Sequence, residues 1–167
     1  MPTPIPPPIP PPPLRLPDWP LPPYRYVPGL NPHPFRHPGG HGYTDGSAPV
    51  EAPWTPGPWT ADRLYLRGLD LFDHRYWWEA HEVWEAIWHQ VPRDEPFAAL
   101  LQGLIQASAA LLKRHLGHPG AAALLVTASV ARLERAPADR GVDPRALAAA
   151  LLDGQPFPTL LSPERPG

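Results

Sequence analysis

The chain has 167 residues, a formal net charge of −2 and no cysteine, which excludes disulfides, thiolate chemistry and cysteine-based zinc sites. No stretch concentrates Lys and Arg, so a nucleic-acid partner is not expected. No run approaches the roughly 18 apolar residues of a membrane span, and the N-terminus lacks the features of a secretory signal. We therefore expect a soluble, cytoplasmic protein without a membrane partner.

Proline dominates the N-terminal third, which holds 21 of the 30 prolines within the first 60 residues. Over residues 1–23 this composition favours extended polyproline II with few backbone donors, and it predicts a disordered tail. A proline-rich ligand segment docked on a partner is the alternative. Residues 24–59 carry aromatic side chains that a solvated linker does not need. We expect this stretch to form an extended arm packed on the core.

Residues 60–155 show helical periodicity and no strand pattern, which predicts an all-α fold. Capping residues, prolines and glycines mark where the helices begin and end, with Thr60 as the first cap. The expected helices span about 60–74, 75–90, 96–116, 119–135 and 144–153. We therefore predict a compact bundle of four to five helices, followed by a C-terminal tail over residues 156–167.

The third expected helix is apolar almost all the way round. Between residues 97 and 112 its polar side chains are Gln102, Gln106 and Ser108. A helix that is apolar on all sides is buried on all sides, so this helix is expected at the centre of the bundle.

The second expected helix carries polar side chains on its hydrophobic side. At 100° per residue, His81 and Glu85 share a side with several tryptophans, while Glu79 and Gln90 project from the opposite face and are expected to meet solvent. Buried polar groups need partners, and the two glutamines of the third helix are the natural ones. The sequence therefore predicts an inter-helix pocket lined by His81, Glu85, Gln102 and Gln106 and walled by Trp84 and Trp88.

Two interpretations of this polar cluster stay open at the level of sequence. In the first, it forms a buried hydrogen-bond network that fixes helix pairing and can also hold a small anionic or amide-bearing ligand. In the second, His81-Glu82-x-x-Glu85 is similar to the zinc-protease pattern His-Glu-x-x-His, with Glu85 in place of the second histidine. His81 and Glu85 would then share a divalent metal ion, and Glu82 would be the candidate base of a metal-dependent hydrolase. Whether the protein is an enzyme is left open.

Two stretches of the sequence resemble a known family. The run from Tyr76 to Trp88, followed by the run from Leu101 to Ala107, resembles the signature of the domain of unknown function 309 family. Residues 117–121 and the helix after them resemble that family's next segment, so the resemblance covers about residues 62–136. It implies a small all-helical domain, with no assigned biochemical role.

Longer members of that family carry an N-terminal arm similar to residues 23–43. The resemblance implies that the arm belongs to the domain and would bring His33 or His41 to the cleft that holds His81 and Glu85. These side chains would then complete a metal site. A homo-oligomer formed through exposed tryptophans is a further expectation.

Overall fold

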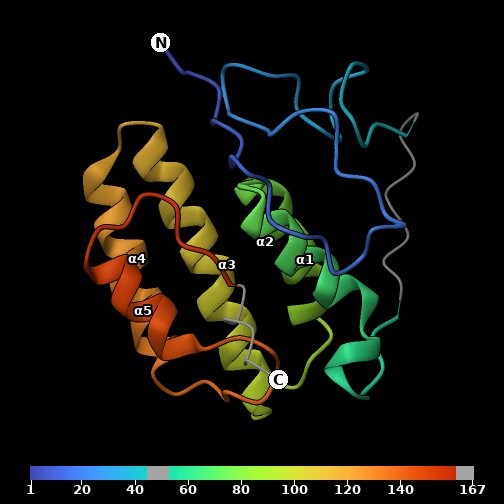
Figure 1. The fold of residues 1–167 in the computed structure, drawn as a ribbon, viewed down its shortest axis with the longest axis vertical. Coiled ribbons are helices and arrows are strands. Elements are labelled where there is room, and N and C mark those ends of the chain that lie inside the picture. The colour runs from blue at the N-terminus through green and yellow to red at the C-terminus, as the bar shows by residue number, and fades with distance from the viewer. Residues whose placement is uncertain (45–52, 161–167) are drawn as a thin grey trace.

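The computed structural model describes residues 1–44 and 53–160, and all regular structure within these ranges is helical (Figure 1). The predicted all-α bundle of four to five helices, with an extended proline-rich N-terminal segment, is confirmed. The elements are a 3-10 helix η1 (Trp59–Ala61), α1 (Arg63–Asp73), α2 (Trp77–Trp88), α3 (Pro96–His115), α4 (Pro119–Leu133) and α5 (Pro144–Leu152).

The helix boundaries follow from capping chemistry. The Asp62 carboxylate accepts the Tyr65 N–H and begins α1, so Asp62 takes the capping role predicted for Thr60. Asp143 likewise accepts two N–H groups at the start of α5. Gly117 ends α3 with a φ of 78°, a left-handed conformation that glycine adopts without steric cost.

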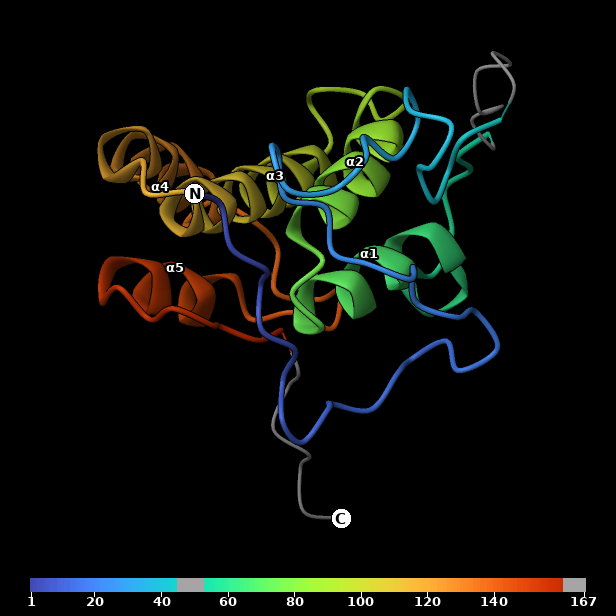
Figure 2. The same ribbon diagram turned by 90° about the horizontal axis from the view of Figure 1, so that it is seen from above.

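Helix α3 lies between α2 and α4, as its apolar surface predicts (Figures 1 and 2). Its length and composition alone would permit a membrane span, but most of its apolar stretch is buried inside the bundle. Gly103 lets α4 approach closely, because a Cβ there would lie 2.7 Å from Leu133 Cδ2. The Ser129 hydroxyl of α4 donates to the Gly103 carbonyl at 2.7 Å across this contact.

Trp84 joins α2 to α1. Its indole is fully buried, and Nε1 donates to the Tyr65 carbonyl at 3.4 Å. The indole occupies the space above Gly68, where a Cβ would overlap it, and its ring centroid lies 6.0 Å from that of Phe72. Trp84 is therefore part of the α1–α2 core.

The proline-rich residues 1–23 follow the helices as an extended chain (Figures 1 and 2). Ile5 and Leu16 are buried in the hydrophobic core. The sequence predicts a disordered tail here, and the structure differs from that prediction because side chains of α1 supply partners for the segment's backbone.

Asp70 on α1 is the main acceptor for this segment. Its carboxylate is only 1% exposed and accepts the backbone N–H groups of Arg15 and Leu16, each at 2.9 Å. Arg15 Nη1 lies 3.2 Å from Asp70 Oδ1 and 2.9 Å from Asp73 Oδ2. Asp73 also accepts the Leu160 N–H, so the N-terminal and C-terminal segments meet at the same pair of carboxylates.

Arginines of α1 and of the residues after it hold carbonyl groups of this segment. Arg67 donates to the Trp19 and Pro20 carbonyls at 2.9 and 2.7 Å, and Arg75 donates to Pro6 at 2.8 Å. Proline has no N–H, so a proline-rich chain offers mostly acceptors, and arginine side chains suit it. These bonds hold carbonyl groups of the segment without a strand partner.

The predicted domain boundaries after residues 23, 59 and 155 stay predictions. Part of the arm predicted over 24–59, residues 45–52, lies outside the described residues. Residues 161–167 of the predicted C-terminal tail lie outside them as well. Of the rest of that tail, Pro158 and Leu160 are buried.

Replacing Asp70 with alanine should cost about 3 kcal/mol or more of unfolding free energy, because two backbone N–H groups and the Arg15 guanidinium lose a buried partner. Urea denaturation would measure the loss. Asp18→Ala is the matched control, since Asp18 pairs with Arg63 at 2.7 Å from a side chain that is 65% exposed, and exposed pairs contribute little. Equal stabilities of the two variants would contradict the anchoring role of Asp70.

Candidate functional site

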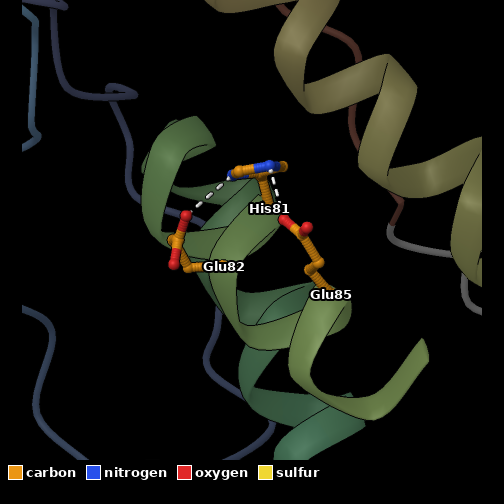
Figure 3. Close-up of side chains that lie close together, drawn as sticks. All are labelled: His81, Glu82 and Glu85. Atoms are coloured by element: carbon orange, nitrogen blue, oxygen red, sulfur yellow. Dashed lines mark ion pairs between the residues drawn. The ribbon is translucent and has the colours of Figure 1, made fainter. Parts of the chain in front are cut away.

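The His81 imidazole lies between two carboxylates on α2 (Figure 3). Nε2 is 2.9 Å from Glu85 Oε2, one helical turn further on, and Nδ1 is 3.5 Å from Glu82 Oε1. The predicted i, i+4 proximity of His81 and Glu85 is present, and Glu82 joins them from the other side of the ring. The opposite carboxylate oxygen of Glu85 lies 3.6 Å from His89 Nε2.

The cluster sits at the margin of the buried face of α2. The side chains of His81, Glu82 and Glu85 are 26%, 36% and 39% exposed, whereas the sequence predicts a buried site. The difference has a geometric cause, because the centre of the buried face is filled by Trp77, Ala80, Trp84 and Ile87. The cluster is therefore open to solvent and to a ligand.

Partial burial raises the pKa of Glu82 above that of an ordinary glutamate. The neighbouring Glu85 charge acts in the same direction, while His81 and the Arg36 guanidinium lower this pKa. Glu82 therefore takes up a proton at a higher pH than a free glutamate would.

The two glutamines of α3 do not complete the predicted hydrogen-bond network. Within residues 1–44 and 53–160, neither Gln102 nor Gln106 donates to or accepts from His81 or Glu85. Gln106 Oε1 is buried without a hydrogen-bond partner in this part of the chain, and so is the indole nitrogen of Trp88. Trp88 is instead covered by Arg93, whose guanidinium lies 3.5 Å from the ring centroid.

The arm histidines lie apart from the cluster. His33 Nδ1 accepts the Phe35 and Arg36 N–H groups at 3.2 Å, and its ring packs 5.4 Å from Trp78. His41 Nε2 lies 3.5 Å from Glu79 Oε2. Among the described residues, the group of potential ligand atoms within 4.8 Å of one another is His81, Glu82 and Glu85. The predicted metal ligands His33 and His41 are not part of it.

Comparison with known proteins finds a family match for the central part of the chain. Residues 65–125 match the model of the family described as Domain of unknown function (DUF309). Over these residues the chain is similar to DUF309 proteins. No curated protein and no solved structure matches the chain. The matched segment includes His81, Glu82 and Glu85 and both glutamines of α3, whereas the N-terminal segment precedes it.

Glu79 connects α2 to the arm, a role that the sequence did not indicate. The side chain is 5% exposed, although the sequence predicts that it meets solvent. Both carboxylate oxygens lie 3.2 Å from the Tyr26 N–H, 53 residues away along the chain. Gln90, predicted to be solvated as well, accepts the Trp54 N–H at 2.6 Å. The sequence did offer one sign that the arm packs on the core, the aromatic side chains of residues 24–43, but it did not show that the arm covers this face of α2.

Truncating Glu79 to alanine should therefore lower the free energy of unfolding by about 2 kcal/mol, because the buried Tyr26 N–H loses its acceptor. Glu82→Ala on the same helix should cost less than about 1 kcal/mol, since no backbone group of residues 1–44 or 53–160 bonds to Glu82. Parallel urea titrations of the two variants would measure both values. A larger loss for Glu82→Ala would contradict this assignment of roles.

Proposed function

We propose that the segment of this chain that matches DUF309 binds a divalent metal ion at His81, Glu82 and Glu85. The observation that supports this most directly is the convergence of one imidazole nitrogen and two carboxylate oxygens, all within 4.8 Å, on one side of α2. Imidazole and carboxylate are ligands that Zn²⁺ and neighbouring transition metals accept. The partial exposure of all three side chains leaves coordination positions for water or a substrate.

Only a small adjustment is needed to bind an ion. Two ligand atoms on one zinc ion, at bond lengths of roughly 2.0–2.2 Å, lie at most about 4.4 Å apart. His81 Nε2 and Glu85 Oε2 already meet this limit at 2.9 Å. Glu82 now faces the other ring nitrogen, so its side chain would rotate toward the Glu85 side to join them.

A purely structural or small-ligand-binding role for the same cluster fits the geometry less well. A network that fixes helix pairing should be buried and mutually bonded. Here the cluster is half-exposed, and in the described part of the chain it makes no hydrogen bond to Gln102 or Gln106. In our proposal the protein works as a soluble cytoplasmic molecule without a nucleic-acid or membrane partner.

Metal-dependent hydrolysis is the second candidate, and the raised pKa of Glu82 favours it. A carboxylate whose pKa is raised by burial is a better proton acceptor than an ordinary one. In this version His81 and Glu85 would hold the ion, which would supply Lewis-acid activation of a water, and Glu82 would serve as the proton acceptor.

Metal analysis and zinc titration of the untagged protein test the metal site. We expect one ion per chain and an increase in Tm on adding zinc, both lost in His81→Ala and Glu85→Ala and kept in the surface control His118→Ala. Affinity should fall on acidification, starting above the usual glutamate range, because the raised pKa of Glu82 makes it protonate early. Wild-type protein that binds no zinc would refute the proposal.

Glu82→Gln separates the two roles of that residue. If Glu82 is a ligand, this substitution weakens zinc binding by about tenfold or more. If Glu82 is a base, zinc stays bound and hydrolysis of an activated ester is lost. Unchanged binding together with unchanged hydrolysis would exclude both roles.

A further inference from the structure

We propose a second binding site, separate from the His81 cluster, that takes a free amino acid with a flat apolar side chain. It is a cavity of about 310 Å³ whose lining includes Trp54, Gln90, Glu95, Phe97 and Arg140. Three parts of the chain meet there: the segment before η1, the α2–α3 connection and the α4–α5 loop. Small-molecule sites span ~300–1,000 Å³, so this cavity suits a ligand of amino-acid size.

Arg140 provides a positioned cation. Its guanidinium lies 4.0 Å from the centroid of the Phe97 ring, and its backbone carbonyl accepts the Tyr65 hydroxyl at 2.9 Å. Across residues 1–44 and 53–160 the guanidinium has neither a carboxylate within 4.0 Å nor a hydrogen-bond acceptor. Other arginines of this protein, such as Arg15 and Arg67, bond to carboxylates or carbonyls. The Arg140 guanidinium is fixed in position and its N–H donors are unused in this part of the chain, so it can bind a ligand carboxylate through two parallel hydrogen bonds.

The aromatic wall of the cavity is fixed in place. The Trp54 and Phe97 ring centroids are 6.0 Å apart, with their planes inclined by 36°. Trp54 is held at its backbone N–H by Gln90 and at its indole nitrogen by Asp62. Phe97 is only 2% exposed, so the aromatic surface open to a ligand is that of Trp54. A rigid aromatic surface favours a flat apolar group, because stacking then costs little conformational entropy.

Glu95 selects a zwitterion over a simple anion. It precedes α3 without capping it through its side chain, and it forms no ion pair among the described residues. A carboxylate and a guanidinium thus line one cavity without pairing with each other. The α-carboxylate of an amino acid would face Arg140 and its ammonium group Glu95, whereas Glu95 repels a ligand that carries only negative charge.

Isothermal titration of the full chain with L-phenylalanine tests the inference, with 3-phenylpropanoate and 2-phenylethylamine as analogues that each lack one charged group. We expect L-phenylalanine to bind and each analogue to bind at least about tenfold more weakly, because one of the two charged side chains that line the cavity then has no ligand group to pair with. The indole signal of Trp54 in an NMR titration should move with L-phenylalanine. No binding at about 10 mM, or equal binding of 3-phenylpropanoate, would overturn the proposal.

Variants locate the site. Arg140→Gln and Glu95→Gln should each weaken L-phenylalanine binding by about tenfold, while Arg135→Gln at an exposed position just after α4 should leave it unchanged. Glu95 is exposed, so Glu95→Gln stays informative even if Arg140→Gln fails to fold. L-Phenylalanine affinity that is unchanged in Glu95→Gln would overturn the assignment, and chelator should have no effect on this site.

Discussion

The carboxylate of Asp70 is the interaction on which the arrangement of this chain depends. A carboxylate that is 1% exposed must be satisfied by donors, since an unpaired buried charge is costly. Here the donors come from a segment more than 50 residues earlier, the N–H groups and guanidinium of Arg15 and the N–H of Leu16. Arg15 also pairs with Asp73. Burial raises the pKa of Asp73, and the Arg15 charge opposes this rise. The N-terminal segment is therefore part of the folded unit.

This docking decides which faces of α2 are open. The arm covers Glu79 and brings Tyr26 and His33 against Trp78. Trp84 and α1 occupy the core side of the same helix. What is left accessible is the strip that carries His81, Glu82 and Glu85. The exposure of the candidate metal site is thus a consequence of how the rest of α2 is buried, and Arg36 of the arm contributes to its electrostatics.

Local chemistry made much of the fold predictable. Prolines and glycines punctuate the helices, and the apolar surface of α3 required a central position. The contact between His81 and Glu85 follows from i, i+4 spacing alone. Features that depend on distant partners were not predictable: nothing near Asp70 or Glu79 in the sequence indicates that backbone groups of residues 15, 16 and 26 will reach them. The position of Trp84 depends on the missing side chain of Gly68, and periodicity does not reveal that pairing. Gln102 and Gln106 were expected to bond to His81 and Glu85 because all four side chains are polar. Polarity alone does not determine where a side chain points, and within residues 1–44 and 53–160 these bonds do not form.

Amide hydrogen exchange at Arg15, Leu16 and Tyr26 tests the central claim most directly. If buried carboxylates hold the N-terminal segment against α1 and α2, these three amides should exchange as slowly as amides in the middle of α3, through unfolding of the whole domain. Exchange at the rate of an unstructured peptide, with α3 still protected, would contradict the account.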